Sequence, residues 1–207
     1  TSLARGAGAD VFLSLHADAL AEGDAQGATV YTLSEDASDE ASAALAERHD
    51  RDDLLAGVDL SDQDDVVAEV LMDMARTETQ PRAERLAGAI VAAVKGAKIR
   101  MHRHPHQSGG FSVLKSPDIP SVLLEVGFLS SDRDFRRLAD PAWRTKLAGA
   151  LVQALGSWAT EDVALRAARQ SRKQPSTPMT MEKNIESQLT TERSNVPLNS
   201  LFRRWVR

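Results

Sequence analysis

The strongest constraint on the fold is a short, almost continuous apolar run that contains one glutamate, residues 122–128 (VLLEVGF). Its length and its branched residues are typical of a strand that is buried on both faces of a sheet. An ionised carboxylate without a partner inside such a strand would cost several kcal/mol, so it needs compensation. Glu125 is therefore expected either to face a cation or a functional site, or to pair with a buried arginine.

A second apolar run, residues 10–15 (DVFLSL), is followed directly by His16. α/β domains place their sites where the chain leaves the sheet, and His16 would lie there. The sequence has no cysteine, so any metal would have to be held by histidines and carboxylates. Taken alone, His16 is either a structural histidine or a ligand. Together with Glu125 it offers what a metal hydrolase needs, because one residue can bind the metal while the other deprotonates water.

The remaining patterns alternate between strands and helices, which predicts an α/β domain with a mixed, mostly parallel sheet flanked by helices. Gly96 is expected to end one helix, and Asp140 with Pro141 to begin the last one. Further strands are expected at residues 28–33, 111–114 and 122–126, helices at 38–48, 66–74, 82–95 and 141–158, and a loop at 50–60.

Charge is distributed unevenly along the 207 residues. The net charge of -5 argues against nucleic-acid binding, and no run of apolar residues is long enough to cross a membrane. From residue 166 onward, however, nine Lys and Arg face only three Asp and Glu. The sequence therefore predicts a folded body over residues 1–160 and a basic, flexible tail over residues 161–207.

Two segments carry a family resemblance: residues 14–19 (SLHADA) and residues 114–130 (LKSPDIPSVLLEVGFLS). Both resemble motifs of the zinc-dependent N-acetylmuramoyl-L-alanine amidases of bacterial cell division, the Amidase_3 family, in the same order along the chain. The resemblance implies that His16 is a zinc ligand and Glu125 the catalytic carboxylate. The implied reaction is hydrolysis of the amide that joins N-acetylmuramic acid to L-alanine in peptidoglycan, in the periplasm or cell envelope.

The sequence also departs from this family. Two further zinc ligands of the family, a histidine in a Gly-His-Gly-Gly-like motif and a glutamate, precede the equivalent of His16 and are absent from residues 1–15. The domain is therefore expected to be incomplete upstream of Thr1, and this chain alone to bind zinc poorly, since catalytic zinc normally has three protein ligands. Ser131 stands where the family usually has asparagine. The alternative function is a catalytically inactive peptidoglycan-binding domain with the amidase fold.

Residues 36–80 resemble the regulatory helical insertion of the division amidases. In these relatives a glutamate from the insertion occupies a metal position until an activator protein removes the helix. Glu47 and His49, within residues 45–50 (LAERHD), are the two candidates here. Residues two apart lie on different faces of a helix, so only one of them is expected to reach the zinc.

The last candidates are residues near the expected cleft. Asp18 and Arg103 are expected to line it. His102, His104 and His106 would share one face of a strand, but Pro105 interrupts such a strand, so we expect an exposed loop that touches the glycan.

Overall fold

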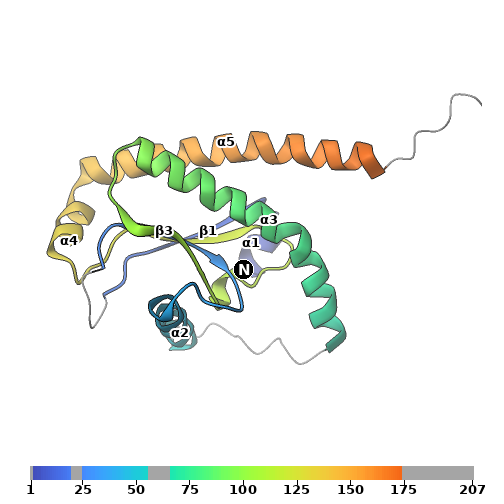
Figure 1. Ribbon diagram of the computed structural model, residues 1–207, viewed down its shortest axis with the longest axis horizontal. Coiled ribbons are helices and arrows are strands. Elements are labelled where there is room, and N and C mark those ends of the chain that lie inside the picture. The colour runs from blue at the N-terminus through green and yellow to red at the C-terminus, as the bar shows by residue number, and fades with distance from the viewer. Residues whose placement is uncertain (1, 20–24, 56–65, 174–207) are drawn as a thin grey trace, which may run out of the picture. The chain divides into compact units, whose positions relative to one another are not determined.

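The computed structural model describes residues 2–19, 25–55 and 66–173 (Figure 1). The chain divides into two compact units, Thr1–Ala164 and Leu165–Arg207, and the sheet lies in the first unit. The elements are α1 (Ser2–Gly6), β1 (Phe12–His16), β2 (Ala28–Leu33), α2 (Glu40–Leu55), α3 (Val66–Gly96), β3 (Met101–Gly109), the 3-10 helix η1 (Ser112–Leu114), β4 (Ser121–Glu125), α4 (Asp132–Ala139) and α5 (Pro141–Lys173).

The four strands form one sheet in the order β1-β4-β2-β3. β1 runs parallel to β4 and β2 parallel to β3, whereas β2 and β4 are antiparallel. This confirms the predicted mixed, mostly parallel sheet. The register pairs His16 with Glu125 and Glu125 with Thr29, so the ends of β1 and β4 and the beginning of β2 meet at one edge.

One face of the sheet carries the larger apolar core, under α3 and α5 (Figure 1). Val122 and Leu124 of β4 point to this face and are fully buried. Since side chains alternate along a strand, Leu123 and Glu125 point to the other face. The larger helical residues of this core are Leu86, Ile90 and Val94 of α3 and Leu147, Leu151 and Trp158 of α5.

The opposite face is covered by α2 and η1 over a smaller core. Leu45 of α2 packs there with Tyr31, Phe111 and Leu123. The ring centroids of Tyr31 and Phe111 lie 5.1 Å apart. Helices therefore cover both faces of the sheet, as expected for an α/β domain.

The expected helix at 38–48 is confirmed as α2, but the expected loop at 50–60 is wrong for residues 50–55, which continue the helix. Residues 56–60 lie outside the described ranges. The side chain of Asp39 accepts hydrogen bonds from the backbone N–H and hydroxyl of Ser42, which caps the helix start. Near the other end, the carboxylate of Asp50 accepts a hydrogen bond of 2.9 Å from the backbone N–H of Ser112. These contacts hold a charged segment helical although its hydrophobic pattern is weak.

The expected strand at 111–114 is wrong, because residues 112–114 form η1. The backbone N–H of Leu114 bonds to the carbonyl of Phe111 at 3.0 Å, which is a turn and not a strand contact. Residues three apart meet on one side of a 3-10 helix, so the side chains of Phe111 and Leu114 are both buried in the core under α2.

The expected exposed loop at 102–106 is also wrong, because these residues belong to the edge strand β3. Pro105 is tolerated there because β3 pairs only with β2 and its register shifts, from Ala28 opposite Met101 to Val30 opposite His106. Between these two pairs one residue of β2 thus lies opposite four residues of β3, which makes a large bulge in β3.

The helices expected around Met74 and over 82–95 are confirmed as parts of α3, which ends at Gly96 as predicted and contains Pro81. The last helix also begins as predicted, with the side chain of Asp140 accepting a bond from the N–H of Ala142. It continues to Lys173, so residues 161–173 are helical where a flexible tail was expected. The rest of that tail, residues 174–207, lies outside the described ranges. None of the described helices has the length and apolar character needed to span a membrane.

Candidate metal centre

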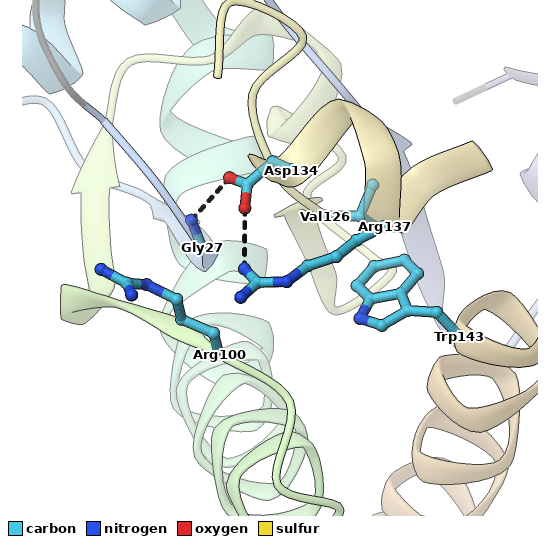
Figure 2. A pocket seen from close by; sticks show the side chains of 6 residues that line it. All are labelled: Gly27, Arg100, Val126, Asp134, Arg137 and Trp143. Atoms are coloured by element: carbon cyan, nitrogen blue, oxygen red, sulfur yellow. Dashed lines mark hydrogen bonds and ion pairs between the residues drawn. The ribbon is translucent and has the colours of Figure 1, made fainter. Parts of the chain in front are cut away.

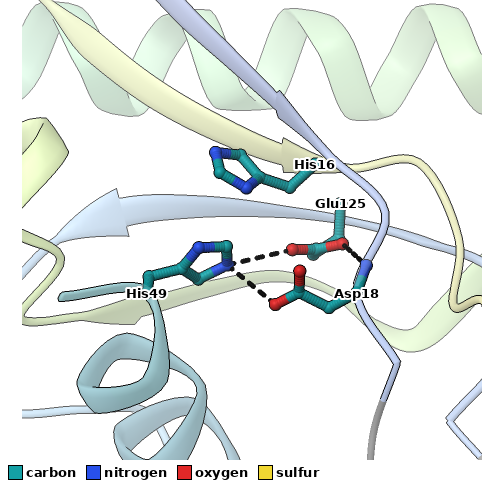
Figure 3. A group of neighbouring side chains, drawn as sticks. All are labelled: His16, Asp18, His49 and Glu125. Atoms are coloured by element: carbon teal, nitrogen blue, oxygen red, sulfur yellow. Dashed lines mark hydrogen bonds and ion pairs between the residues drawn. The ribbon is translucent and has the colours of Figure 1, made fainter. Parts of the chain in front are cut away.

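Four side chains that can bind a metal meet at the edge where β1 and β4 end: His16, Asp18, His49 and Glu125 (Figure 3). One donor atom from each residue lies within 4.8 Å of all the others. β1 supplies His16, the segment after it supplies Asp18, β4 supplies Glu125, and α2 supplies His49 from across the sheet face. The register explains the first contacts, since His16 and Glu125 are direct neighbours on parallel strands.

Glu125 is the most enclosed member of the group, with a fully buried side chain. Its Oε2 accepts a hydrogen bond of 3.3 Å from the backbone N–H of Asp18, and its Oε1 lies 3.3 Å from Nε2 of His49. Burial raises the pKa of Glu125 above its ordinary value, and the contact with His49 opposes that shift only in part. The contacts described for Glu125 come from His49 and Asp18, so its positive partner here is a histidine and not the buried arginine of the alternative.

His49 is the positive partner of two carboxylates. Its Nε2 lies 3.0 Å from Oδ2 of Asp18 in addition to its contact with Glu125, and the residue is 5% exposed. Burial lowers the pKa of His49, but the two carboxylates outweigh this effect and raise it to about 9. The hydrogen bond with His49 likewise lowers the pKa of Asp18. One imidazolium thus compensates two carboxylates that water cannot reach freely.

His16 lies edge-on to His49, with ring centroids 4.2 Å apart and planes at 87°. Its Nε2 shares a hydrogen bond of 2.7 Å with the hydroxyl of Ser14, two residues earlier on the same face of β1. The backbone carbonyl of His16 accepts from the N–H of Val126 at 2.9 Å, which ties the two strand ends together. The ring is therefore oriented by neighbouring residues before any ligand binds.

The donor set fits a divalent cation of the zinc type. Imidazole nitrogens and carboxylate oxygens are the ligands that zinc accepts where cysteine is absent. The fit also follows from charge, because the buried Glu125 and the partly buried Asp18 need a positive charge that His49 supplies here only when it is protonated. A bound cation would serve the same purpose.

A buried carboxylate outside the group fixes the chain that leaves β4. Asp134 of α4 is 2% exposed, and its Oδ2 accepts from the backbone N–H of Gly27 at 2.7 Å and of Phe128 at 3.3 Å. Its Oδ1 accepts from Arg137 at 3.0 Å (Figure 2). Gly127, at φ 156°, passes so close to Asp134 that an added Cβ would lie 3.1 Å from its side chain. Sequence reasoning did not find Asp134, although a charged residue three positions after the capping Ser131 was a usable signal.

The other candidates divide between the group and its surroundings. Glu47 is exposed on α2 while His49 is buried, so α2 brings only the second of the two alternatives to the centre. Asp18 belongs to the group itself, whereas Arg103 lines a neighbouring cleft of about 470 Å³ together with His102. Ser131, which replaces the family's asparagine, caps α4 by accepting from the N–H of Asp134.

The fold and the site together define an α/β domain that gathers histidines and carboxylates at one sheet edge, as metallohydrolases do. Residues 1–157 match the Amidase_3 family, described as N-acetylmuramoyl-L-alanine amidase, and the chain belongs to this family.

Named relatives agree with this membership. The chain is 36% identical over 152 residues to the N-acetylmuramoyl-L-alanine amidase AmiA of Escherichia coli (strain K12), which covers 73% of this chain and 52% of that protein. It is 31% identical over 159 residues to AmiC of Neisseria meningitidis serogroup B. The match covers 76% of this chain and 38% of that protein. The crystal structure of the apo form of Ami1 from Mycobacterium abscessus shares the fold, with a TM-score of 0.50 and 16% sequence identity. The match covers 76% of this chain and 58% of that one. The chain thus spans about half the length, or less, of these curated relatives.

Proposed function

We propose that this chain is part of a zinc-dependent amidase that hydrolyses the bond between N-acetylmuramic acid and L-alanine in peptidoglycan during septal cell-wall splitting and turnover. The observation that carries the proposal is the fully buried Glu125 beside His16 and within reach of two more metal-binding side chains, in a member of the Amidase_3 family. A carboxylate held at this desolvation cost has a purpose in a hydrolase and none in a module that only binds.

The roles follow from the positions of the side chains. His16 is a zinc ligand, oriented by Ser14. When bound, zinc would polarise the scissile carbonyl and make the attacking water more acidic. Glu125 takes the proton from that water and then passes it to the nitrogen of L-alanine as the amide bond breaks. Water supplies both the hydroxyl that stays on the carbonyl carbon of the lactyl group and the proton that leaves with the amine, so no covalent enzyme intermediate is needed.

His49 keeps the centre closed. Its imidazole fills the space between Asp18 and Glu125, and there it competes with a metal for the carboxylates and with water for the base. We propose that α2 is the autoinhibitory helix of the inserted segment 36–80 and that an activator protein must draw it away. Residues 56–65 of this segment lie outside the described ranges, so the proposal rests on α2.

The substrate sets the location. Peptidoglycan lies outside the cytoplasmic membrane, so an enzyme that cuts it works in the periplasm or cell envelope.

The test measures zinc content and release of dye from labelled peptidoglycan, for the full-length protein of which this chain is part and for its Glu125→Gln variant. If the variant keeps about one zinc per chain but loses release, the hydrolase assignment and the role of Glu125 both stand. A full-length protein that holds no zinc and releases no dye, even after α2 is removed by deletion of residues 38–79, would instead be the inactive peptidoglycan-binding domain.

A further inference from the structure

We propose that Asp134 of α4 is a positioning residue for Glu125 and acts on it through the backbone of the segment after β4 and of Asp18. The inference rests on the proposed function, because it takes Glu125 to be the base of the hydrolase. Asp134 lies outside the four-residue metal group and is 2% exposed. Its carboxylate is enclosed by protein donors, so it acts on the protein and not on the substrate (Figure 2).

A continuous series of hydrogen bonds leads from Asp134 to Glu125. Oδ2 of Asp134 accepts from the backbone N–H of Phe128 at 3.3 Å. The next backbone N–H, that of Leu129, donates to the carbonyl of Asp18 at 2.7 Å. The N–H of Asp18 in turn donates to Oε2 of Glu125 at 3.3 Å (Figure 3). The position of the Glu125 carboxylate therefore depends on a segment that Asp134 holds.

The same oxygen of Asp134 also holds the start of β2. It accepts from the backbone N–H of Gly27 at 2.7 Å, directly before the strand. Gly27 has φ 86° and lies against the backbone of Met101, where an added Cβ would be 2.6 Å from the carbonyl carbon. Two residues later, Thr29 pairs with Glu125 of β4. Asp134 thus fixes both the entry into β2 and the exit from β4, at the end of the sheet where Glu125 lies.

The needs of α4 itself do not explain these contacts. Ser131 caps α4, and its hydroxyl accepts from the N–H of Asp134. In a capping box the side chain three positions after the cap bonds back to the N–H of the cap residue. Here the N–H of Ser131 donates instead to the carbonyl of Phe128 at 3.0 Å. The carboxylate of Asp134 therefore reaches two segments outside its own helix.

Anchoring one oxygen of Glu125 leaves the other for proton transfer. Oε2 accepts from the N–H of Asp18, whereas Oε1 faces His49. Once α2 is drawn away, Oε1 is the oxygen that accepts the proton of water, and the bond to Oε2 keeps the carboxylate from rotating. Proton transfer requires donor and acceptor atoms about 2.6–3.2 Å apart, so a loosened carboxylate slows the reaction more than it weakens substrate binding.

The test uses the full-length protein of which this chain is part and measures amide hydrogen exchange together with kcat and KM for labelled peptidoglycan. Asp134→Ala is expected to accelerate exchange of the Asp18 and Leu129 N–H groups about tenfold. It should lower kcat about tenfold and change KM less than about twofold. Asp134→Asn should restore exchange and kcat, because its amide oxygen can still accept from both backbone N–H groups. Arg137, with its side chain 32% exposed, can turn away from the new amide.

Asp162→Ala is the matched control, since Asp162 is 3% exposed and also pairs with an arginine, Arg82, between α3 and α5. It should lower stability towards urea but leave kcat and exchange at Asp18 unchanged. If Asp134→Ala does not fold, Asp134→Ser takes its place, because its hydroxyl is one bond too short to hold both segments.

Unchanged exchange at Asp18 and unchanged kcat in the Asp134 variant would overturn the positioning role, as would equal losses in Asp162→Ala. A failure of Asp134→Asn to restore either quantity would also count against it. Accelerated exchange at Asp18, in a protein whose wild type releases no dye, would support the series of hydrogen bonds and refute the hydrolase. Dye release that does not depend on Asp134, with unchanged exchange, would do the reverse.

Discussion

The two faces of the sheet are built on different principles. The face under α3 and α5 is an apolar core in which Leu86, Ile90 and Leu124 are all fully buried. Its main charged pair, Arg82 with Asp162, is closed by two hydrogen bonds of 2.9 and 2.8 Å. The face under α2 has a smaller apolar core and buries Glu125 and His49 at its edge.

This difference separates stability from chemistry. On the α3–α5 face every buried group named above has an apolar neighbour or a matched charge, so the face lowers the free energy of the folded state. On the α2 face two carboxylates share one imidazolium, so part of that stabilisation is given up. Such an arrangement is expected where a cation or a substrate completes the site. The predictions below test whether the two roles can be changed independently.

The largest expected effect is on the α2 face. Glu125→Gln should lower the rate of peptidoglycan hydrolysis by about 10²- to 10⁴-fold, because the amide cannot accept the proton of water. The free energy of unfolding should change little, since the shape is kept and a desolvated charge is removed. Dye release and urea unfolding measure the two quantities. A variant within tenfold of the wild-type rate would contradict the assignment of Glu125 as the base.

The next effect belongs to the other face. Leu86→Ala should lower the free energy of unfolding by about 2–5 kcal/mol, through lost burial and the cavity left behind. Leu45→Ala, in the smaller core under α2, is the matched control on the opposite face. It should loosen α2 and change global unfolding less, so hydrogen exchange should accelerate over residues 40–50 while α3 stays protected. Equal protection losses in both variants would mean that the two faces do not act separately.

The regular elements could be predicted from the sequence better than the irregular ones. The strands at 28–33 and 122–126 and the end of α3 at Gly96 were predicted correctly, because burial on a regular element leaves a period or a cap in the sequence. η1, the end of α2 and the bulge in β3 were missed. Each depends on contacts between segments distant in sequence, such as Asp50 with Ser112.

The candidate site shows the same limit. Glu125 and His16 could be singled out because a charged residue in an apolar run is a local anomaly. That Asp18 and His49 would complete the group depends on α2 crossing the sheet, which no local pattern specifies. Asp134 left a local signal in its position after Ser131, but its contact with the distant N–H of Gly27 could not be predicted.

A smaller effect, on the hydrolysis rate, is expected from a change in α2 at His49. His49→Ala should raise the basal hydrolysis rate about tenfold, which corresponds to the loss of one charged contact of about 1.4 kcal/mol between α2 and the centre. Glu47→Ala, on the same helix but exposed, is the matched control and should leave the rate unchanged. Dye release without activator measures both. A fall in rate for His49→Ala would show that His49 supports the chemistry instead of blocking it.

The smallest effect lies at the opposite end of β4 from Glu125, where Arg5 holds Asp118 by two hydrogen bonds of 2.8 Å. The Arg5 hydrogen bond lowers the pKa of Asp118 to about 2 from 3.8. Because the pKa is lower in the folded state, the pair stabilises the fold fully above about pH 4, and this contribution disappears as the pH falls towards 2. Both side chains are about half exposed, at 51% and 46%, so solvent screening limits the effect to about 1 kcal/mol or less.

Asp118→Asn measures this contribution against a neutral side chain of the same shape. The difference in unfolding free energy between wild type and variant should be constant from pH 7 to 5, shrink towards pH 3, and fall with added salt. A difference independent of both pH and salt would mean that the pair acts through packing. The contrast with Glu125 then gives the reason for the two magnitudes. Water solvates the carboxylate of Asp118, so its ion pair with Arg5 adds little. Water is excluded from Glu125, so its charge must be compensated by a protein side chain or a bound cation.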